Sequence, residues 1–184
     1  TGAAATDGDE VSISGVTAGQ QSTSITVTVG DDGGGLEEND FDDDQTNDGS
    51  VAVSLAALQS NGVDFSNAYV SATNDQESNQ ISAISGEVQQ DNNRLLIDVS
   101  GGTFDANDVT FDVTISGVDT TGASTADGIS GTYSIYDQAG ATDILYSNTA
   151  TPTSIGFIEV VDTSDGSTTE VASLDDALDA TSIN

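Results

Sequence analysis

Histidine, cysteine, methionine and tryptophan are absent from this chain, and Arg94 is its only basic residue. Without histidine, cysteine or lysine it cannot build a Ser-His-Asp or Cys-His site or form a Schiff base. The lack of cysteine also excludes disulfides and thiolate zinc sites. A carboxylate pair of the glycosidase type remains available, but sugar-cleaving sites also use aromatic side chains, and the chain has only four Tyr and five Phe. We therefore expect that the protein is not an enzyme.

Acidic residues dominate what is present: 32 Asp and Glu give a formal net charge of −31 over 184 residues. Such a chain repels itself at low salt, because the Debye length is about 30 Å at 0.01 M and only about 3 Å at 1 M. The sequence therefore predicts a protein that works in molar salt. The same charge repels phosphate groups, so we expect no nucleic-acid partner. No apolar run approaches the roughly 20 residues needed to cross a bilayer, so we also expect no direct membrane insertion.

Apolar and polar residues alternate with a period of two, which predicts β-strands. In SITVTV (24–29) and VTFDVTIS (109–116), Ile, Val and Phe alternate with Thr, Asp and Ser. This pattern is typical of half-buried antiparallel strands. Weaker strands are predicted at 10–16, 50–58, 68–73, 80–88, 95–99, 131–136, 144–147, 154–161 and 168–172.

Turn motifs separate these strands and indicate the fold class. The motifs are NDG at 47–49, NG at 61–62, SGG at 100–102, and DG at 127–128 and 165–166. GFIEVV and STTEVAS, joined by DTSDG, predict a hairpin. About ten short strands and a single Pro predict one all-β domain over residues 1–184. We expect an antiparallel β-sandwich with jelly-roll topology, or alternatively an Ig-like one.

Helix is expected in one place only. SLDDALDA (173–180) has Ser173 as a possible N-cap and leucines spaced by four, which predicts a short C-terminal helix. LAALQSN (55–61) could form a helical turn, but we favour a strand that leads into a loop there.

The segment DDGGGLEENDFDDDQTND (31–48) carries nine carboxylates in eighteen residues and predicts a long acidic loop at 30–50. Asp40, Asp42 and Asp44 match the D-x-D-x-D spacing of a calcium loop. An EF-hand is not expected, because Gln45 replaces the glycine of that motif and its final glutamate is missing. We favour a hydrated acidic loop, with these three aspartates as candidate ligands if a surface Ca²⁺, Mg²⁺ or K⁺ is bound there. We expect no other cofactor.

Three residues are candidates for an interface. Arg94 begins a predicted strand, where it could pair with Asp91, Asp98 or an acid of a neighbouring subunit. We favour a structural ion pair for Arg94, and because the chain has no other cation, an interface role is the sharper alternative. Tyr133 and Tyr136 lie in TYSIYDQ, and at least one of them should face outward. Exposed tyrosines suit contact surfaces, although a half-buried tyrosine at the rim of a core is the alternative.

The whole chain resembles proteins of salt-in halophilic archaea and their viruses, since acids, Thr and small residues replace Lys around a β-branched core. In size, composition and β-pattern it is similar to the smaller major capsid protein of icosahedral haloarchaeal viruses with an internal membrane. This resemblance implies a virion component, an upright single jelly roll that packs with its own copies and with a second related shell protein. It carries no diagnostic motif, so it implies no site residues.

We therefore expect a structural, self-assembling protein of a halophilic system, with a viral capsid subunit as the first hypothesis. The alternative is an exported haloarchaeal surface protein: a pilus subunit that donates EVSISGV (10–16) as a strand, or an Ig-like module of a surface layer. None of the 11 Asn begins an N-x-S/T acceptor, which favours a protein that is not exported by a glycosylating route. Thr1 could follow either an initiator Met or a cleaved export signal. A sugar-binding module and a glycoside hydrolase are hypotheses from other classes.

Overall fold

The computed structural model describes residues 11–30, 48–75, 83–100, 110–161 and 168–171. Antiparallel sheets account for most of these residues, and helix is scarce. The all-β prediction is therefore confirmed. The acidic segment 31–47 and the predicted helix at 173–180 lie outside the described residues.

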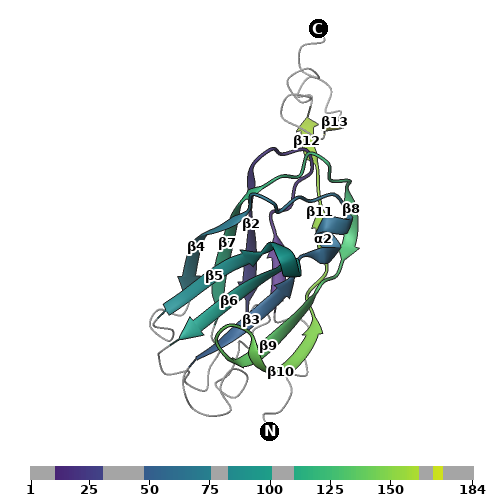
Figure 1. Ribbon diagram of the computed structural model, residues 1–184. Coiled ribbons are helices and arrows are strands. Elements are labelled where there is room, and N and C mark those ends of the chain that lie inside the picture. Colours follow the sequence, from purple (N-terminus) through teal and green to yellow (C-terminus); the bar gives the residue numbers. More distant parts are fainter. Residues whose placement is uncertain (1–10, 31–47, 76–82, 101–109, 162–167, 172–184) are drawn as a thin grey trace.

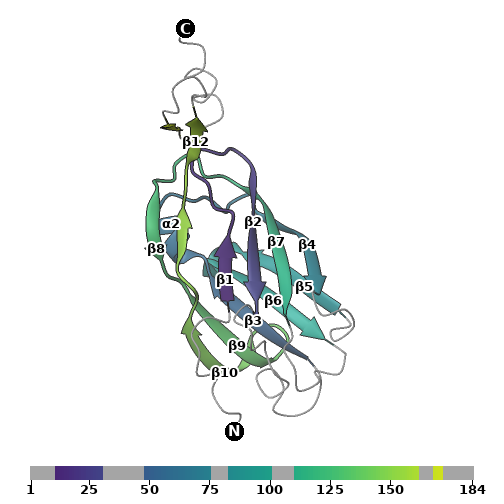
Figure 2. The ribbon, with the colours of Figure 1, turned by 180° about the vertical axis from the view of Figure 1, so that it is seen from behind.

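Two sheets form the body of the molecule (Figures 1 and 2). The four-stranded sheet has the order β1 (Val11–Ser14), β2 (Thr23–Val29), β7 (Phe111–Val118) and β4 (Tyr69–Asp75). The five-stranded sheet has the order β10 (Thr142–Thr149), β9 (Thr132–Gln138), β3 (Asp48–Ser54), β6 (Arg94–Ser100) and β5 (Ala83–Gln89). Every pairing within them is antiparallel.

The inward-facing residues of both sheets form one buried cluster, and their period of two is the one that the sequence predicts. From the four-stranded sheet, Ile25, Val27, Val29, Phe111, Val113 and Ile115 are fully buried. From the five-stranded sheet, Val51, Val53, Leu95, Ile97, Val99 and Ile135 are fully buried. Thr26, Thr28, Asp112 and Thr114 alternate with the first group and are half-buried on the outer side. The core is thus a single layer between the sheets.

Two smaller strand pairs lie beside the body. β8 (Ala126–Ile129) pairs with β11 (Thr153–Ile155), and β12 (Ile158–Val161) pairs with β13 (Thr168–Val171). The second pair is the hairpin predicted around DTSDG, and the described chain confirms it. Other boundaries differ from the prediction: DG at 127–128 lies within β8, NDG at 47–49 runs into β3, and the stretch 154–161 is divided between β11 and β12.

The expectation of a strand leading into a loop at 55–61 is wrong, because Ala56–Ser60 forms the short helix α2. Leu55 and Leu58, three residues apart, are both buried in the core, and alanine has the highest helix propensity. The Asn61 side-chain amide donates to the Ala57 carbonyl at 2.8 Å and ends the helix. The spacing of three between the buried leucines Leu55 and Leu58 therefore indicates a helix here.

Edge contacts close the body on both sides. Val11 pairs with Val29 of its own chain, so in this structure the segment proposed as a donated strand belongs to its own sheet. The outer edge of β1 is covered, because the Thr151 N–H donates to the Val11 carbonyl at 2.8 Å and Gly156 bridges in parallel to Thr17. On the opposite side, β4 packs against β5. β10 is an edge strand, and among the described strands it pairs only with β9.

Candidate interaction surface

The candidate interface residues lie on the five-stranded sheet. On β6, Leu95, Ile97 and Val99 point into the core, so Arg94, Leu96 and Asp98 point outward. The strand register extends this outer face over the neighbouring strands in three rows. These rows are Ser54, Arg94 and Gln89; Ala52, Leu96 and Glu87; and Ser50, Asp98 and Ser85. Tyr136 of β9 joins the third row opposite Ser50.

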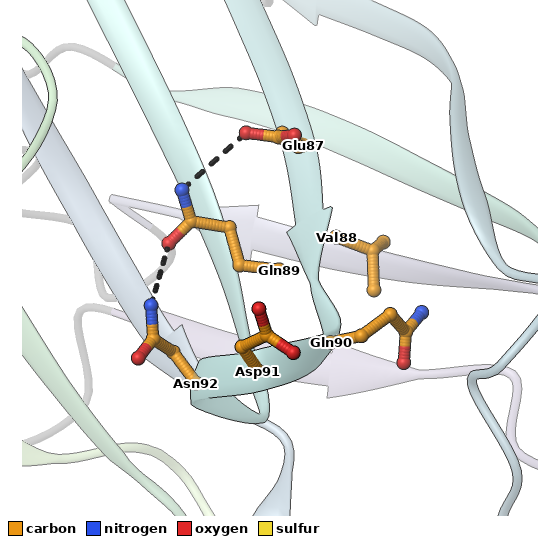
Figure 3. Close-up of a pocket in the computed structure, with 6 residues that line it drawn as sticks. All are labelled: Glu87, Val88, Gln89, Gln90, Asp91 and Asn92. Carbon is orange, nitrogen blue, oxygen red and sulfur yellow. Dashed lines mark hydrogen bonds between the residues drawn. The ribbon is translucent and has the colours of Figure 1, made fainter.

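Arg94 is half-buried and has a neutral partner. Its Nε–H donates to Oε1 of Gln89 at 2.8 Å. The Gln89 amide also donates to Glu87 at 3.3 Å and accepts from Asn92 at 3.4 Å (Figure 3). In the part of the chain that the structure describes, Arg94 makes no ion pair with Asp91 or Asp98. The guanidinium is thus held in place by a neutral amide, and among the described residues it has no carboxylate partner.

A polar pocket of about 370 Å³ opens next to this network. It is lined by Glu87, the end of β5, and the 3₁₀ turn η1 (Gln90–Asn92) that connects β5 to β6 (Figure 3). The Gln90 side chain donates to the Phe65 carbonyl and fixes one wall. Two of the lining residues are acidic, Glu87 and Asp91, so the pocket does not suit an anion.

The turn between β9 and β10 folds over the other end of the outer face. The Gly140 N–H donates to Oδ1 of Asp98 at 2.8 Å, and the Ala141 N–H donates to Oγ of Ser50 at 3.0 Å. The Ser50 hydroxyl in turn donates to the Gln138 carbonyl at 2.8 Å. These bonds hold Ala141 at a φ of 57°, a left-handed conformation that alanine rarely adopts. We call residues 138–142 the β9–β10 tip.

Leu96 is the apolar residue at the centre of this face. It is only 6% exposed although it points away from the core cluster, and Ala52 beside it is equally covered. The two residues therefore form a small second layer outside the sheet, next to the Asp98 and Ser50 side chains that hold the tip.

The two candidate tyrosines lie on opposite sides of their strand. Tyr136 is half-buried on the outer face, with Ile144 directly opposite on β10 and 59% exposed. Tyr133 is 1% exposed inside the core, so its side chain offers no contact surface. Their positions differ by three, and residues an odd number of positions apart on a strand point to opposite faces, so both tyrosines cannot point outward. Sequence reasoning missed Ile144 and also Tyr69, which begins β4 and is 59% exposed.

The candidate metal ligands Asp40, Asp42 and Asp44 lie outside the described residues. Within the described ranges, no group of three or more Asp or Glu could share a metal ion. Asp64 and Asp119 form an antiparallel bridge, which joins their backbones through two hydrogen bonds. The Thr121 hydroxyl and N–H both donate to Asp119, at 2.6 and 2.8 Å, and these bonds hold the pKa of that carboxyl below its ordinary value.

The described helices include none that is long and apolar enough to cross a membrane. No protein-family model matches the chain, and a search of curated proteins likewise returns no match.

Proposed function

We propose that this chain is an Ig-like β-sandwich module of a halophilic cell surface, a structural building block that associates with copies of itself and catalyses no reaction. The observation that carries the proposal is strand order. The order β1-β2-β7-β4 corresponds by position to A-B-E-D of an Ig domain, and β10-β9-β3-β6-β5 corresponds to G-F-C-C′-C″ of the variable type. The connectivity differs between the C and E positions, because the chain there runs through β4, β5 and β6 in the order D, C″, C′, the reverse of the Ig order.

The same strand order weighs against the capsid hypothesis. A jelly roll of the viral type places its first two strands in different sheets, whereas the first two strands that the structure describes, β1 and β2, are neighbours in one sheet. The compositional resemblance to haloarchaeal virus coats applies equally to surface proteins from the same hosts. We therefore place the exported surface module ahead of the capsid subunit, with copies of this chain as the first partner and the outside of the cell as the location.

The distribution of charge supports self-association. More than half of the 32 acidic residues fall outside the described residues. The strands of the four-stranded sheet contain only Asp75 and Asp112, and Asp112 accepts a hydrogen bond from Thr28 at 2.7 Å. In molar salt, where charges more than about 3 Å apart are screened, such faces can meet without strong repulsion. Contact between copies is therefore feasible despite a net charge of −31.

Electron microscopy of the purified chain in about 3 M KCl, a concentration at which the Debye length is below about 3 Å, tests the proposal. We expect planar or filamentous arrays as the protein concentration rises. Closed icosahedral shells would transfer the assignment to the capsid alternative, and dispersed monomers at every concentration would overturn self-assembly itself. Dilution into about 0.01 M KCl serves as the control, because unscreened charge should disperse any array.

A further inference from the structure

We infer that the outer face of the four-stranded sheet binds a neutral glycan, one sugar ring of which stacks on Tyr69 while its hydroxyl groups donate hydrogen bonds to serines beside that ring. This ligand is additional to the proposed function, and its binding does not depend on contact between copies. The Tyr69 side chain is 59% exposed at the start of β4. Figure 2 looks onto this sheet, and no described helix or strand lies over its outer face.

The Tyr69 ring is held on the outer face by its own sheet. Tyr69 pairs with Ser116 of β7, whereas Val70 next to it packs against the core, so Tyr69 points outward. A Cβ atom at Gly117 would lie 3.4 Å from Cε1 of Tyr69, which places one edge of the ring beside this glycine. Gly117 has a φ of 74°, a conformation that favours glycine. The ring is thus supported at one edge and open to a ligand elsewhere.

Three serine hydroxyls, which we call the serine row, form a hydrogen-bonded chain next to the ring. The Ser116 hydroxyl donates to Ser71 at 2.8 Å, and Ser71 donates to the Thr114 carbonyl at 3.3 Å. A hydroxyl has one hydrogen, so Ser24 is the donor in its 2.8 Å contact with Ser116. All three protons are used within the row, and the oxygens keep lone pairs. The serine row therefore offers acceptors, which suit a ligand rich in O–H donors.

Threonine hydroxyls and methyl groups cover the next part of the face. Thr26 and Thr114 are cross-strand neighbours, half-buried on the outer side. Their hydroxyls have no hydrogen-bond partner among the described residues, so they can both donate and accept. Their methyl groups and the exposed Ala72, opposite Thr114, add small apolar areas. The three strands β2, β7 and β4 span about 10 Å, so the face matches an extended ligand that carries both C–H and O–H groups.

Charge favours a neutral ligand on this face. The strands of the sheet contain only Asp75 and Asp112 as charged residues, and Asp112 lies about 13 Å along β7 from Ser116. Molar salt screens charges more than about 3 Å apart, whereas hydrogen bonds and ring stacking do not require net charge. The C–H groups of a sugar suit the negative face of an aromatic ring. A second copy fits less well, because its serine row would oppose acceptors to acceptors.

Calorimetric titration in about 3 M KCl tests the inference. The probes are neutral oligomers of glucose, mannose and galactose, with a chitosan oligomer as the cationic comparison. We expect a neutral oligomer to bind, and Tyr69→Ala to weaken its binding about tenfold or more. Tyr69→Phe keeps the ring and should bind more tightly than Tyr69→Ala. Ile144→Ala is the matched control, because it removes an equally exposed side chain from the other sheet, and it should leave binding unchanged.

Ser24→Ala tests the serine row separately. It removes an exposed hydroxyl at one end of the row, so binding should weaken about threefold or more while circular dichroism stays unchanged. The inference is overturned if no neutral oligomer binds, or if wild type and Tyr69→Ala bind equally well. Tighter binding of the chitosan oligomer than of the neutral ones would overturn it in favour of a cation site.

Sedimentation of Tyr69→Ala without glycan separates the second copy from the glycan as occupant of this face. We expect the variant to self-associate as wild type does. Loss of self-association in Tyr69→Ala, together with no glycan binding by wild type, would assign the face to a second copy. A wild type that binds glycan but stays monomeric would contradict the proposed self-association and leave the glycan site standing.

Discussion

The methyl groups of Val70 on β4 occupy the space that a side chain at Gly86 on β5 would need. A Cβ atom at Gly86 would lie 2.9 Å from one Val70 methyl carbon and 3.3 Å from the other. This contact closes one side of the body, where the edges of the two sheets meet. A side chain at position 86 would thus displace Val70, so packing between the sheets favours glycine there.

Gly86→Val should therefore lower the free energy of unfolding by about 1–3 kcal/mol, the usual range for an overpacked core. Urea unfolding in molar KCl measures the change. Ser85→Ala, at the exposed neighbouring position on the same strand, is the matched control and should change little. The pair Gly86→Ala with Val70→Ala should be more stable than the sum of the two single changes predicts. Simple additivity would argue against the contact.

Thr120 is a fully buried polar residue that joins the segment after β7 to the connection between β1 and β2. Its hydroxyl donates to the Thr17 carbonyl at 2.5 Å and accepts from the Gln20 N–H at 2.9 Å. Thr120→Val keeps the shape but leaves both backbone groups without this partner, so we expect a loss of about 1–3 kcal/mol in the free energy of unfolding. Thr125→Val, at an exposed position nearby, should fall within about 0.5 kcal/mol of wild type. Equal effects of the two changes would show that Thr120 does not have this role.

Asp119 gives the protein a defined response to acid. Because hydrogen bonds from the Thr121 hydroxyl and N–H lower its pKa in the folded state, its ionised form is favoured by folding. Its contribution to stability is present above the ordinary aspartate pKa and is lost as pH falls through the lowered value. Thr121→Val should raise the pKa of Asp119 in a carboxyl NMR titration, whereas Thr121→Ser should not. If Asp119 in the valine variant titrates as in wild type, the Thr121 hydroxyl is not the main cause of its lowered pKa.

The sequence predicted the strands well where a single physical signal decides the structure. Alternation of apolar and polar residues places Ile25, Val27 and Val29 in the core, and the burial of these residues agrees. Two errors arose where local signals compete. The Asp-Gly pair at 127–128 suggested a turn, but strand pairing with β11 places it in β8. The second error is at α2. The strand pattern of β3 was extended into α2, so the helical spacing of Leu55 and Leu58 was not recognised.

The candidate surface could be predicted only in part, because a face is a property of several strands. Arg94 was identified as the single cation, but its neutral partner Gln89 depends on the hairpin between β5 and β6. The alternation rule required one outward tyrosine, and only the core position of Tyr133 shows that it is Tyr136. The position of the β9–β10 tip above Asp98 depends on long-range hydrogen bonds that no local pattern encodes.

Salt dependence follows from the same charges. Below about 1 M salt, the repulsion within a chain of net charge −31 is no longer screened. Copies should therefore separate first, and the folded chain should unfold at still lower salt. Circular dichroism during dialysis reports the second step, and recovery of the signal when KCl is restored serves as its control.

Sedimentation velocity of the wild-type chain across a KCl series tests the central claim most directly. From about 3 M down to about 0.01 M KCl, the Debye length grows from below about 3 Å to about 30 Å. We expect species heavier than the 18.5 kDa monomer at high salt and their loss as salt falls. A single compact 18.5 kDa species at every salt concentration would contradict it.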